Sequence, residues 1–139
     1  MVISMSNLIK LGSRTITSNS SPYIIAEIGV NHEGSIEKAK ELIELAKSGG
    51  ADAAKFQSYK ANKLASKFSP SYWDTSKEKT KSQYELFKKY DKFSQNDYQI
   101  LAKYCKKIGI EFLSTPFDEE AIEFLDELMP FYKIASADI

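Results

Sequence analysis

Short apolar runs alternate with helical patterns along most of this sequence, and that alternation limits the folds open to it. Four short, largely apolar runs predict buried strands, at residues 23–29, 53–57, 110–115 and 131–136. Apolar residues at helical spacing separate the runs, with two helical patterns between the second run and the third. Strands alternating with helices predict a parallel sheet with right-handed crossovers.

The residues before the first strand predict a separate element. Two short runs around Gly12, between residues 8 and 17, are typical of a β-hairpin, and residues 18–22 form a polar linker. An open four-stranded flavodoxin-like sheet is the rival fold, but it gives no account of this hairpin or of the two helices in the second crossover.

The charge balance and the distribution of apolar residues exclude several classes of partner. The 139 residues carry 19 basic and 19 acidic side chains, whereas a nucleic-acid-binding domain needs a basic patch. No apolar stretch reaches the ~18 residues of a membrane span, and the amino terminus lacks the pattern of a signal peptide. We therefore expect a cytoplasmic protein with no nucleic-acid or membrane partner, and we expect its one cysteine, Cys105, to fill the core.

Polar side chains follow the predicted strands at the points where they end. Because the carboxyl ends of parallel strands meet on one face, such folds place their chemistry there. A carboxylate within the first run would be costly to bury unless it were paired or used. Two lysines with several hydroxyls suit an anionic, oxygen-rich substrate. The candidates, in chain order, are Glu27, Asn31, His32, Lys55, Gln57, Ser114, Thr115, Lys133, Ser136 and Asp138.

These groups also have a structural interpretation. Lys55 and Lys133 could pair with Glu27 and Asp138 inside a barrel. A single histidine without a second ligand at the usual spacing is weak evidence for a metal site, so we interpret His32 as a loop histidine. The recurrence of polar ends on four strands favours a functional interpretation; no single residue decides it.

Four stretches of the sequence resemble motifs of the sialic acid synthase family, whose members condense phosphoenolpyruvate with an N-acyl hexosamine. They are YIIAEIGVNHEG at 23–34, GADAAKFQ at 50–57, FLSTPFD at 112–118 and YKIASAD at 132–138. The resemblance implies the amino-terminal half of a (β/α)8 TIM barrel with four parallel strands. Residues 1–22 would be the hairpin and linker, and residues 23–139 the first half of the barrel domain, ending after strand four.

The same resemblance implies roles for the polar strand ends. The methylene carbon of phosphoenolpyruvate would attack the aldehyde of the open-chain sugar, and phosphate would leave by carbon–oxygen cleavage while lysines and hydroxyls stabilise the shifting charge. The implied catalytic residues are Glu27, Lys55 and Lys133, and the implied substrate-binding residues are Gln57, Thr115, Ser136 and Asp138. Glu27 and Asp138 would face the sugar; the others would line the phosphoenolpyruvate pocket.

The resemblance also implies a divalent metal, manganese or magnesium, and a homodimer in the complete enzymes. The metal-binding histidines of the family lie in the second half of the barrel, and a complete barrel needs about 250 residues. We therefore expect this chain to lack the metal ligands and to be inactive on its own.

Two other interpretations stay open. The chain could be a Schiff-base aldolase or lyase that uses Lys55 or Lys133 as nucleophile, or a non-enzymatic half-barrel that associates with another chain. Within the synthase interpretation the hexosamine is not identified: N-acetylmannosamine and a legionaminic acid precursor are both compatible. The long polar segment 60–79, which contains Tyr72 and Trp73, is expected to lie over the sugar end.

Overall fold

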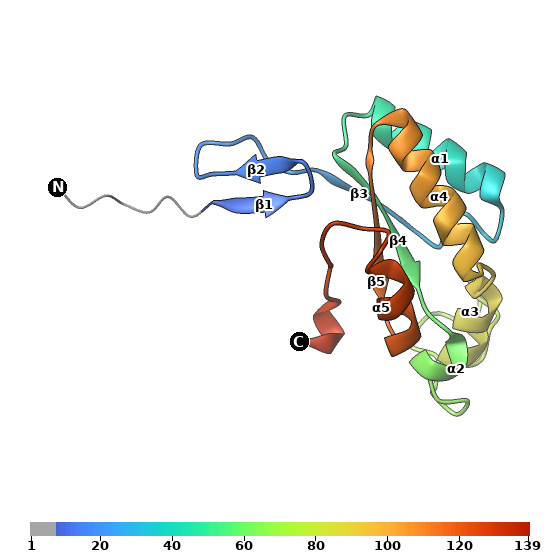
Figure 1. Cartoon of the computed structure of the whole chain (residues 1–139). Helices are drawn as coiled ribbons and strands as arrows, with labels where there is room; N and C mark the ends of the chain where they lie inside the picture. The colour runs from blue at the N-terminus through green and yellow to red at the C-terminus, as the bar shows by residue number, and fades with distance from the viewer. Residues whose placement is uncertain (1–7) are drawn as a thin grey trace.

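The fold is an α/β unit built on a three-stranded parallel sheet, with a separate antiparallel hairpin (Figure 1). The computed structural model describes residues 8–139. The hairpin strands are β1 (Ile9–Leu11) and β2 (Arg14–Ile16); the sheet has the order β3 (Ile25–Gly29), β4 (Ala53–Ser58), β5 (Glu111–Pro116). The helices are α1 (Ile36–Ser48), α2 (Ala61–Leu64), α3 (Gln83–Tyr90), α4 (Gln95–Ile108) and α5 (Glu119–Leu125), and a 3₁₀ turn spans Ser136–Asp138. The predicted class, the parallel strand direction and the hairpin are confirmed.

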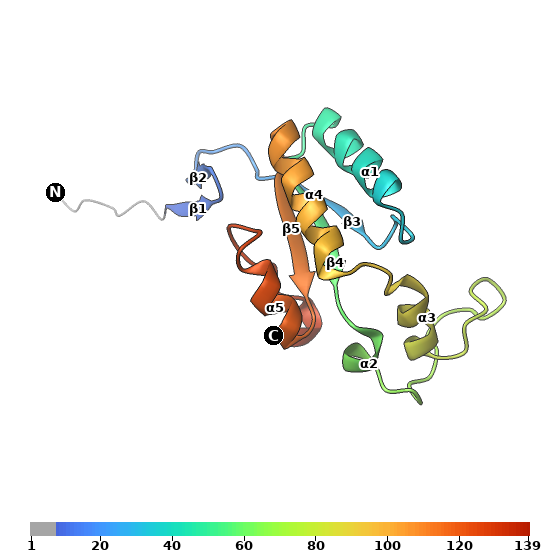
Figure 2. The ribbon, with the colours of Figure 1, turned by 45° about the vertical axis from the view of Figure 1, so that its right-hand side comes forward.

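The core lies between the sheet and the two longest helices, which run side by side over one face (Figures 1 and 2). Ile43 of α1 and Leu101 of α4 are fully buried, and Phe56 of β4 stacks on Phe112 of β5 with ring centroids 5.8 Å apart. Each such apolar side chain contributes about 1.5–3 kcal/mol when fully buried. Cys105 is buried in this layer, as expected.

Both long helices begin at serines whose hydroxyls accept hydrogen bonds from the first turn. The Ser35 side chain accepts from the Lys38 N–H at 3.1 Å. Ser94 and Asp97 form a reciprocal capping box. These caps satisfy N–H groups that have no partner within the helix, so the helix starts are fixed by local sequence.

The fourth strand expected over residues 131–136 is absent. This segment forms no ladder with β5; instead Phe131 packs edge-on against Tyr23, with ring centroids 5.8 Å apart, and the Tyr132 hydroxyl donates to Asp126 at 2.8 Å. Parallel pairing is slightly weaker per residue than antiparallel pairing, and an edge strand would have a partner on one side only. Aromatic contacts therefore hold the segment where strand pairing was predicted.

One arginine fastens the hairpin to the amino end of the sheet. Arg14 donates to Asp52 Oδ1 at 2.7 Å and to the carbonyl of Ser21 at 3.1 Å, while Asp52 Oδ2 accepts from the N–H of Ile24 at 2.7 Å. Both carboxylate oxygens of Asp52 are therefore used. Among residues 8–139, no helix is long and apolar enough to cross a membrane.

We expect Asp52→Asn to lower the free energy of unfolding by roughly 1–2 kcal/mol, because hydrogen bonds to charged groups are stronger than neutral ones. The hydrogen bond from Ile24, followed by the Arg14 guanidinium, lowers the pKa of Asp52 below 3.8. Its contribution is therefore complete above about pH 4 and is lost as the pH falls through the lowered pKa. Urea unfolding at neutral and acid pH measures this, with the exposed Glu123→Gln as control. Equal losses for Asp52→Asn at both pH values would contradict the assignment.

Candidate active site

The two faces of the sheet have different environments because successive side chains of a strand point to opposite sides. Phe56 and Ser58 face the helical layer, where Ser58 Oγ hydrogen-bonds Ser114 Oγ at 2.7 Å. Lys55 and Gln57 therefore lie on the other face. This second face carries the polar groups predicted for a site.

A buried ammonium group pairs with a half-exposed carboxylate at the centre of this face. Lys55 lies opposite Glu27 in the β3–β4 register, and its ammonium donates to Glu27 Oε2. The Lys55 side chain is 9% exposed and the Glu27 side chain 53% exposed. The expectation that the carboxylate would be buried is wrong, because the lysine is the buried partner. The Glu27 carboxylate is thus open to solvent on one side.

A β-bulge brings the end of β3 close to Gln57. The register of β3 against β4 shifts between Glu27 and Gly29, and Gly29 has a φ of +56°. A β-carbon at Gly29 would lie 3.4 Å from Glu27 Oε1 and 3.7 Å from Gln57 Nε2. Bulges often redirect a side chain at a functional site. Here the bulge places the Glu27 carboxylate and the Gln57 amide on either side of a residue without a side chain.

Thr115 joins this group from β5. It lies opposite Gln57 in the β4–β5 register and is buried, and cross-strand partners share a face. Four of the seven predicted site residues are therefore gathered on one face: Glu27, Lys55, Gln57 and Thr115.

The other three predicted site residues lie apart from this group. Lys133, Ser136 and Asp138 are exposed, and the Lys133 ammonium donates to the carbonyl of Ile134. Within residues 8–139, no hydrogen bond or ion pair joins these three to the sheet. The missing fourth strand explains this, because strand pairing was the feature expected to align them with Thr115.

His32 is enclosed in the loop after β3. Its ring stacks on Phe93 with centroids 3.8 Å apart, and Nδ1 accepts from the N–H of Gly34 at 3.0 Å. The proton of the neutral ring is therefore on Nε2, which is buried and has no partner among the described residues. Burial, followed by the charge of Lys38, lowers the pKa of His32 to about 4. The ring is thus neutral at physiological pH.

The described residues do not fit a divalent metal. Within residues 8–139, no three His, Cys, Asp or Glu side chains are grouped as metal ligands. His32, the one histidine of the sequence, is held between aromatic rings.

Two aspartates tie the strand ends together: Asp118, which was predicted as a helix cap, and Asp91, which sequence reasoning missed. Asp91 accepts from the Lys60 ammonium and from the N–H of Ala61, both at 3.0 Å. Asp118 accepts from the N–H of Lys60 at 3.1 Å and from that of Ala121 at 3.0 Å. Asp91 thus caps α2, whose own N-cap residue, Lys60, makes no capping bond. The absence of a capping side chain before α2 was the available signal.

These bonds hold the start of α2 at the carboxyl end of β4 (Figure 2). Residues 61–82, here called the insert, continue from this point. The insert also closes on itself, because the Trp73 indole N–H lies 3.2 Å from the carbonyls of both Glu78 and Thr80. That segment 60–79 lies over the sugar end stays a prediction.

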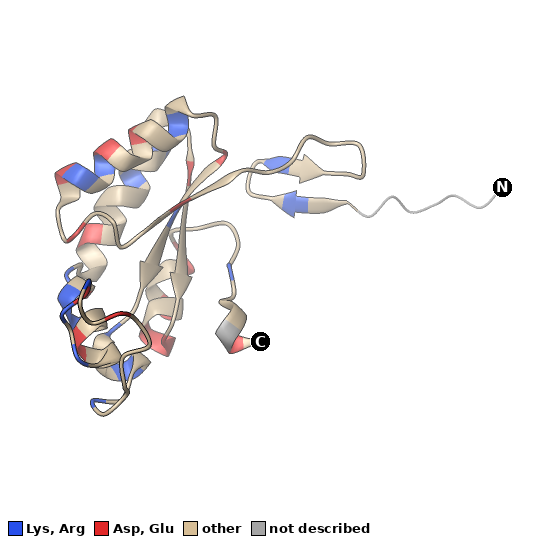
Figure 3. Cartoon of the chain, turned by 180° about the vertical axis from the view of Figure 1, so that it is seen from behind, with Lys and Arg blue, Asp and Glu red and all other residues tan. Residues whose placement is uncertain are grey.

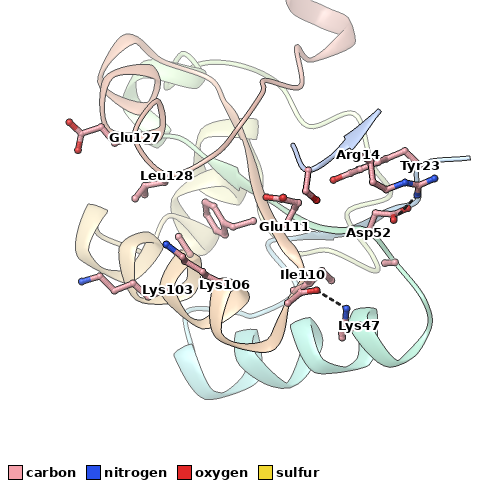
Figure 4. Close-up of a pocket in the computed structure, with 15 residues that line it drawn as sticks. Arg14, Tyr23, Lys47, Asp52, Lys103, Lys106, Ile110, Glu111, Glu127 and Leu128 are labelled. Carbon is pink, nitrogen blue, oxygen red and sulfur yellow. Dashed lines mark hydrogen bonds and ion pairs between the residues drawn. The ribbon is translucent and has the colours of Figure 1, made fainter. Parts of the chain in front are cut away.

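A cavity of about 630 Å³ lies at the opposite, amino-terminal end of the strands (Figure 4). Several of its charged groups already have structural partners: Arg14 binds Asp52, and Lys47 donates to the carbonyl of Gly109 at 2.6 Å. In β/α folds this end serves stability and the carboxyl end serves chemistry. The gathered group on β3, β4 and β5 is therefore the better candidate site.

A parallel α/β sheet with a buried lysine and other polar groups near its carboxyl edge is typical of enzymes that bind anionic substrates. Residues 42–139 match the model of the NeuB family. The chain belongs to this family, that of the sialic or nonulosonic acid synthases, and corresponds to an amino-terminal portion of its relatives.

Two characterised relatives are equally similar to the chain. The N,N'-diacetyllegionaminic acid synthase of Legionella pneumophila is 42% identical over 88% of this chain and 35% of that protein. The human N-acetylneuraminate-9-phosphate synthase is 42% identical over 84% of this chain and 33% of that protein. The chain thus spans about a third of the length of the relatives it matches.

A solved structure of a related protein also matches the chain over part of its length. The N-acetylneuraminic acid synthetase of Leptospira borgpetersenii, in complex with citrate, superimposes with a TM-score of 0.76 at 30% identity. The match covers 96% of this chain and 42% of that one.

The unequal burial of the Lys55–Glu27 pair predicts unequal effects on stability. Glu27→Gln leaves a buried ammonium without its counter-charge and should lower the free energy of unfolding by roughly 1–3 kcal/mol. Lys55→Met leaves a carboxylate that water already reaches, and should cost less than about 1 kcal/mol. Urea denaturation of both variants and of the double variant measures the difference. The exposed Lys38–Glu33 pair is the matched control, because such pairs contribute little. A larger loss for Lys55→Met would contradict this account.

Proposed function

We propose that the chain forms the phosphoenolpyruvate-binding part of a nonulosonic acid synthase. In this proposal residues 23–139 are the first half of a TIM-barrel domain, and residues 1–22 are its hairpin and linker. The complete domain would condense phosphoenolpyruvate with an N-acyl hexosamine and release phosphate, as a homodimer. The observation that carries the proposal is the buried Lys55 ammonium, flanked by Glu27, Gln57 and Thr115 on the face of the sheet opposite α1 and α4.

The chemistry of these groups suits such a reaction. Lys55 would act as a point charge for the phosphate or carboxylate of phosphoenolpyruvate. The Thr115 hydroxyl and the Gln57 amide would donate hydrogen bonds to the same oxygens. Because these donors are fixed on strands, they need little reorganisation as charge shifts to the departing phosphate. Glu27, with its solvent-facing oxygen, would contact the sugar.

The proposed reaction forms one carbon–carbon bond and replaces the carbon–oxygen bond to phosphate with one to an oxygen from water. The methylene carbon of phosphoenolpyruvate attacks the sugar aldehyde, whose oxygen takes up a proton. Water adds to the resulting oxocarbenium carbon and loses a proton, and the tetrahedral intermediate expels phosphate. Lys133 and Ser136 are assigned to the phosphoenolpyruvate pocket, and Asp138 to the sugar, on the resemblance of YKIASAD alone.

Similarity to the relatives does not identify the sugar. The relatives named for diacetyllegionaminic acid and for N-acetylneuraminate 9-phosphate are both 42% identical to the chain. An N-acyl hexosamine is the class that the two names share.

A Schiff-base aldolase or lyase is the second candidate function, and the burial of Lys55 favours it, because desolvation makes a lysine a better nucleophile. Borohydride trapping with a carbonyl substrate separates the two functions. The proposed condensation needs no imine and predicts no trapped adduct.

We expect Lys55→Met to weaken phosphoenolpyruvate binding by at least about tenfold, because a charge-assisted contact within the site contributes about 1.5–3 kcal/mol. The line width and shift of the phosphorus NMR signal of phosphoenolpyruvate measure this affinity. Lys106→Met, on the exposed side of α4, is the control and should bind like the parent chain. Unchanged affinity of the Lys55 variant would remove this residue from the proposed site.

We also expect the chain alone to bind phosphoenolpyruvate without turning it over. Lys133, Ser136 and Asp138 lie outside the gathered group, and His32 is not available to a metal. A phosphate-release assay with phosphoenolpyruvate, N-acetylmannosamine and manganese tests this, with light scattering to report self-association. Phosphate release at an enzymatic rate by a monomer would contradict the expectation.

A further inference from the structure

Positive charge is concentrated in one part of a chain that is neutral overall. Residues 60–92 contain nine lysines and four carboxylates, an excess of five positive charges, whereas the whole sequence has 19 of each sign. Lysines gather over α2, α3 and the loop between them (Figure 3). The remainder of the chain must therefore carry the opposite excess.

Most of these lysines have no counter-charge close by. Lys60, Lys63 and Lys89 are in ion pairs. The other six are exposed, and none has an acidic partner within 4.0 Å among the described residues. These six, here called the basic rim, are Lys67, Lys77, Lys79, Lys81, Lys88 and Lys92.

The segment that carries the basic rim is anchored at the carboxyl end of β4. The bonds of Asp91 and Asp118 hold Lys60 and Ala61 there, and the Tyr59 hydroxyl donates to the carbonyl of Phe87, next to Lys88 in α3. On the β3 side, a β-carbon at Gly34 would come within 2.8 Å of Lys92 Cβ, so Lys92 packs against the loop that follows Glu27. The rim therefore borders the strand ends from two directions.

We propose that the basic rim collects small phosphate-bearing anions from solution and raises the rate at which they reach the strand ends. Fixed charges of one sign beside a site can raise association rates by about 10- to 1,000-fold. Lysine suits this role because its ammonium is a strongly hydrated point charge that attracts an anion without binding it through a rigid fork. That the collected anion is phosphoenolpyruvate rests on the proposed function; the attraction itself does not.

Trp73 is a built-in probe of the local potential. It is the one tryptophan of the sequence, and its indole bonds to the backbone of Glu78 and Thr80, between rim lysines. Because iodide is intrinsically the more efficient quencher of an indole, the ratio of iodide to caesium quenching is compared with that of free N-acetyltryptophanamide, and an excess over this reference is here called the iodide preference. We expect an iodide preference at about 0.1 M ionic strength, where the Debye length is about 10 Å, and none at about 1 M, where it is about 3 Å.

The variants distinguish the effect of the rim lysines from the effect of the total charge of the protein. Lys77, Lys79 and Lys81 are changed together to Gln and, separately, to Glu; the matched controls change Lys103, Lys106 and Lys107 of α4 in the same way. The rim triple to Glu should abolish the iodide preference and slow phosphoenolpyruvate association by about tenfold at low salt, with the Gln triple intermediate. The α4 triples should change neither value. Urea midpoints verify that all variants are folded.

Three results would overturn the proposal: no preference for iodide, equal effects of rim and α4 triples, or a rim effect that persists at high salt. If the parent chain does not bind phosphoenolpyruvate at low salt, the proposed function fails. Two measurements on the rim and α4 variants then decide whether the rim concentrates anions. They are the quenching of Trp73 and the phosphorus NMR line width of inorganic phosphate. Both proposals would be supported if the rim variant associates with phosphoenolpyruvate more slowly while the effect of Lys55→Met on affinity stays the same.

Discussion

The pairing of Lys55 with Glu27 is the interaction on which both the sheet and the candidate site depend. An ammonium group as deeply buried as that of Lys55 is costly without a counter-charge, and the carboxylate comes from the neighbouring strand. A slip of β3 by one residue would turn Glu27 to the other face and leave the charge unpaired. The same pair thus fixes the register of β3 on β4 and presents the Glu27 carboxylate on the face opposite the two long helices.

Three aspartates connect elements that are distant in sequence, and each uses both of its carboxylate oxygens. Asp52 joins the hairpin to the start of the sheet at the amino end. Asp91 and Asp118 join the insert and α5 to the strand ends at the other. Since charge-assisted bonds to backbone N–H groups are stronger than neutral ones, these residues define loop positions that the apolar core does not reach.

Local signals predicted most of the elements correctly. Ser35 and Ser94 precede regular apolar patterns, so both long helices could be predicted from caps and periodicity. The pairing of Glu27 with Lys55 was one of the open interpretations, but the burial of the lysine and the exposure of the carboxylate were not predicted. Which partner is buried depends on the elements that pack around the pair, and these are not encoded in the residues next to it.

The strand that was wrongly predicted and the aspartate that was missed have a common physical cause. Residues 131–136 have strand-like composition, but strand formation needs a partner, and the contacts of Phe131 and Tyr132 satisfy these side chains without one. Asp91 was missed because it caps a helix thirty residues earlier in the chain, a relation that local patterns do not contain. Apart from the Glu27–Lys55 pair, contacts between distant elements were thus the part that the sequence did not reveal.

The order of the strands has a consequence for the synthesis of the protein. Because β3, β4 and β5 are adjacent in the sheet in the order in which they occur in the chain, each new strand pairs with the one made just before it. Domains generally fold as units during synthesis, amino-terminal parts first. The sheet can therefore grow on the ribosome strand by strand, and the buried lysine of β4 finds its carboxylate on a strand that has already emerged.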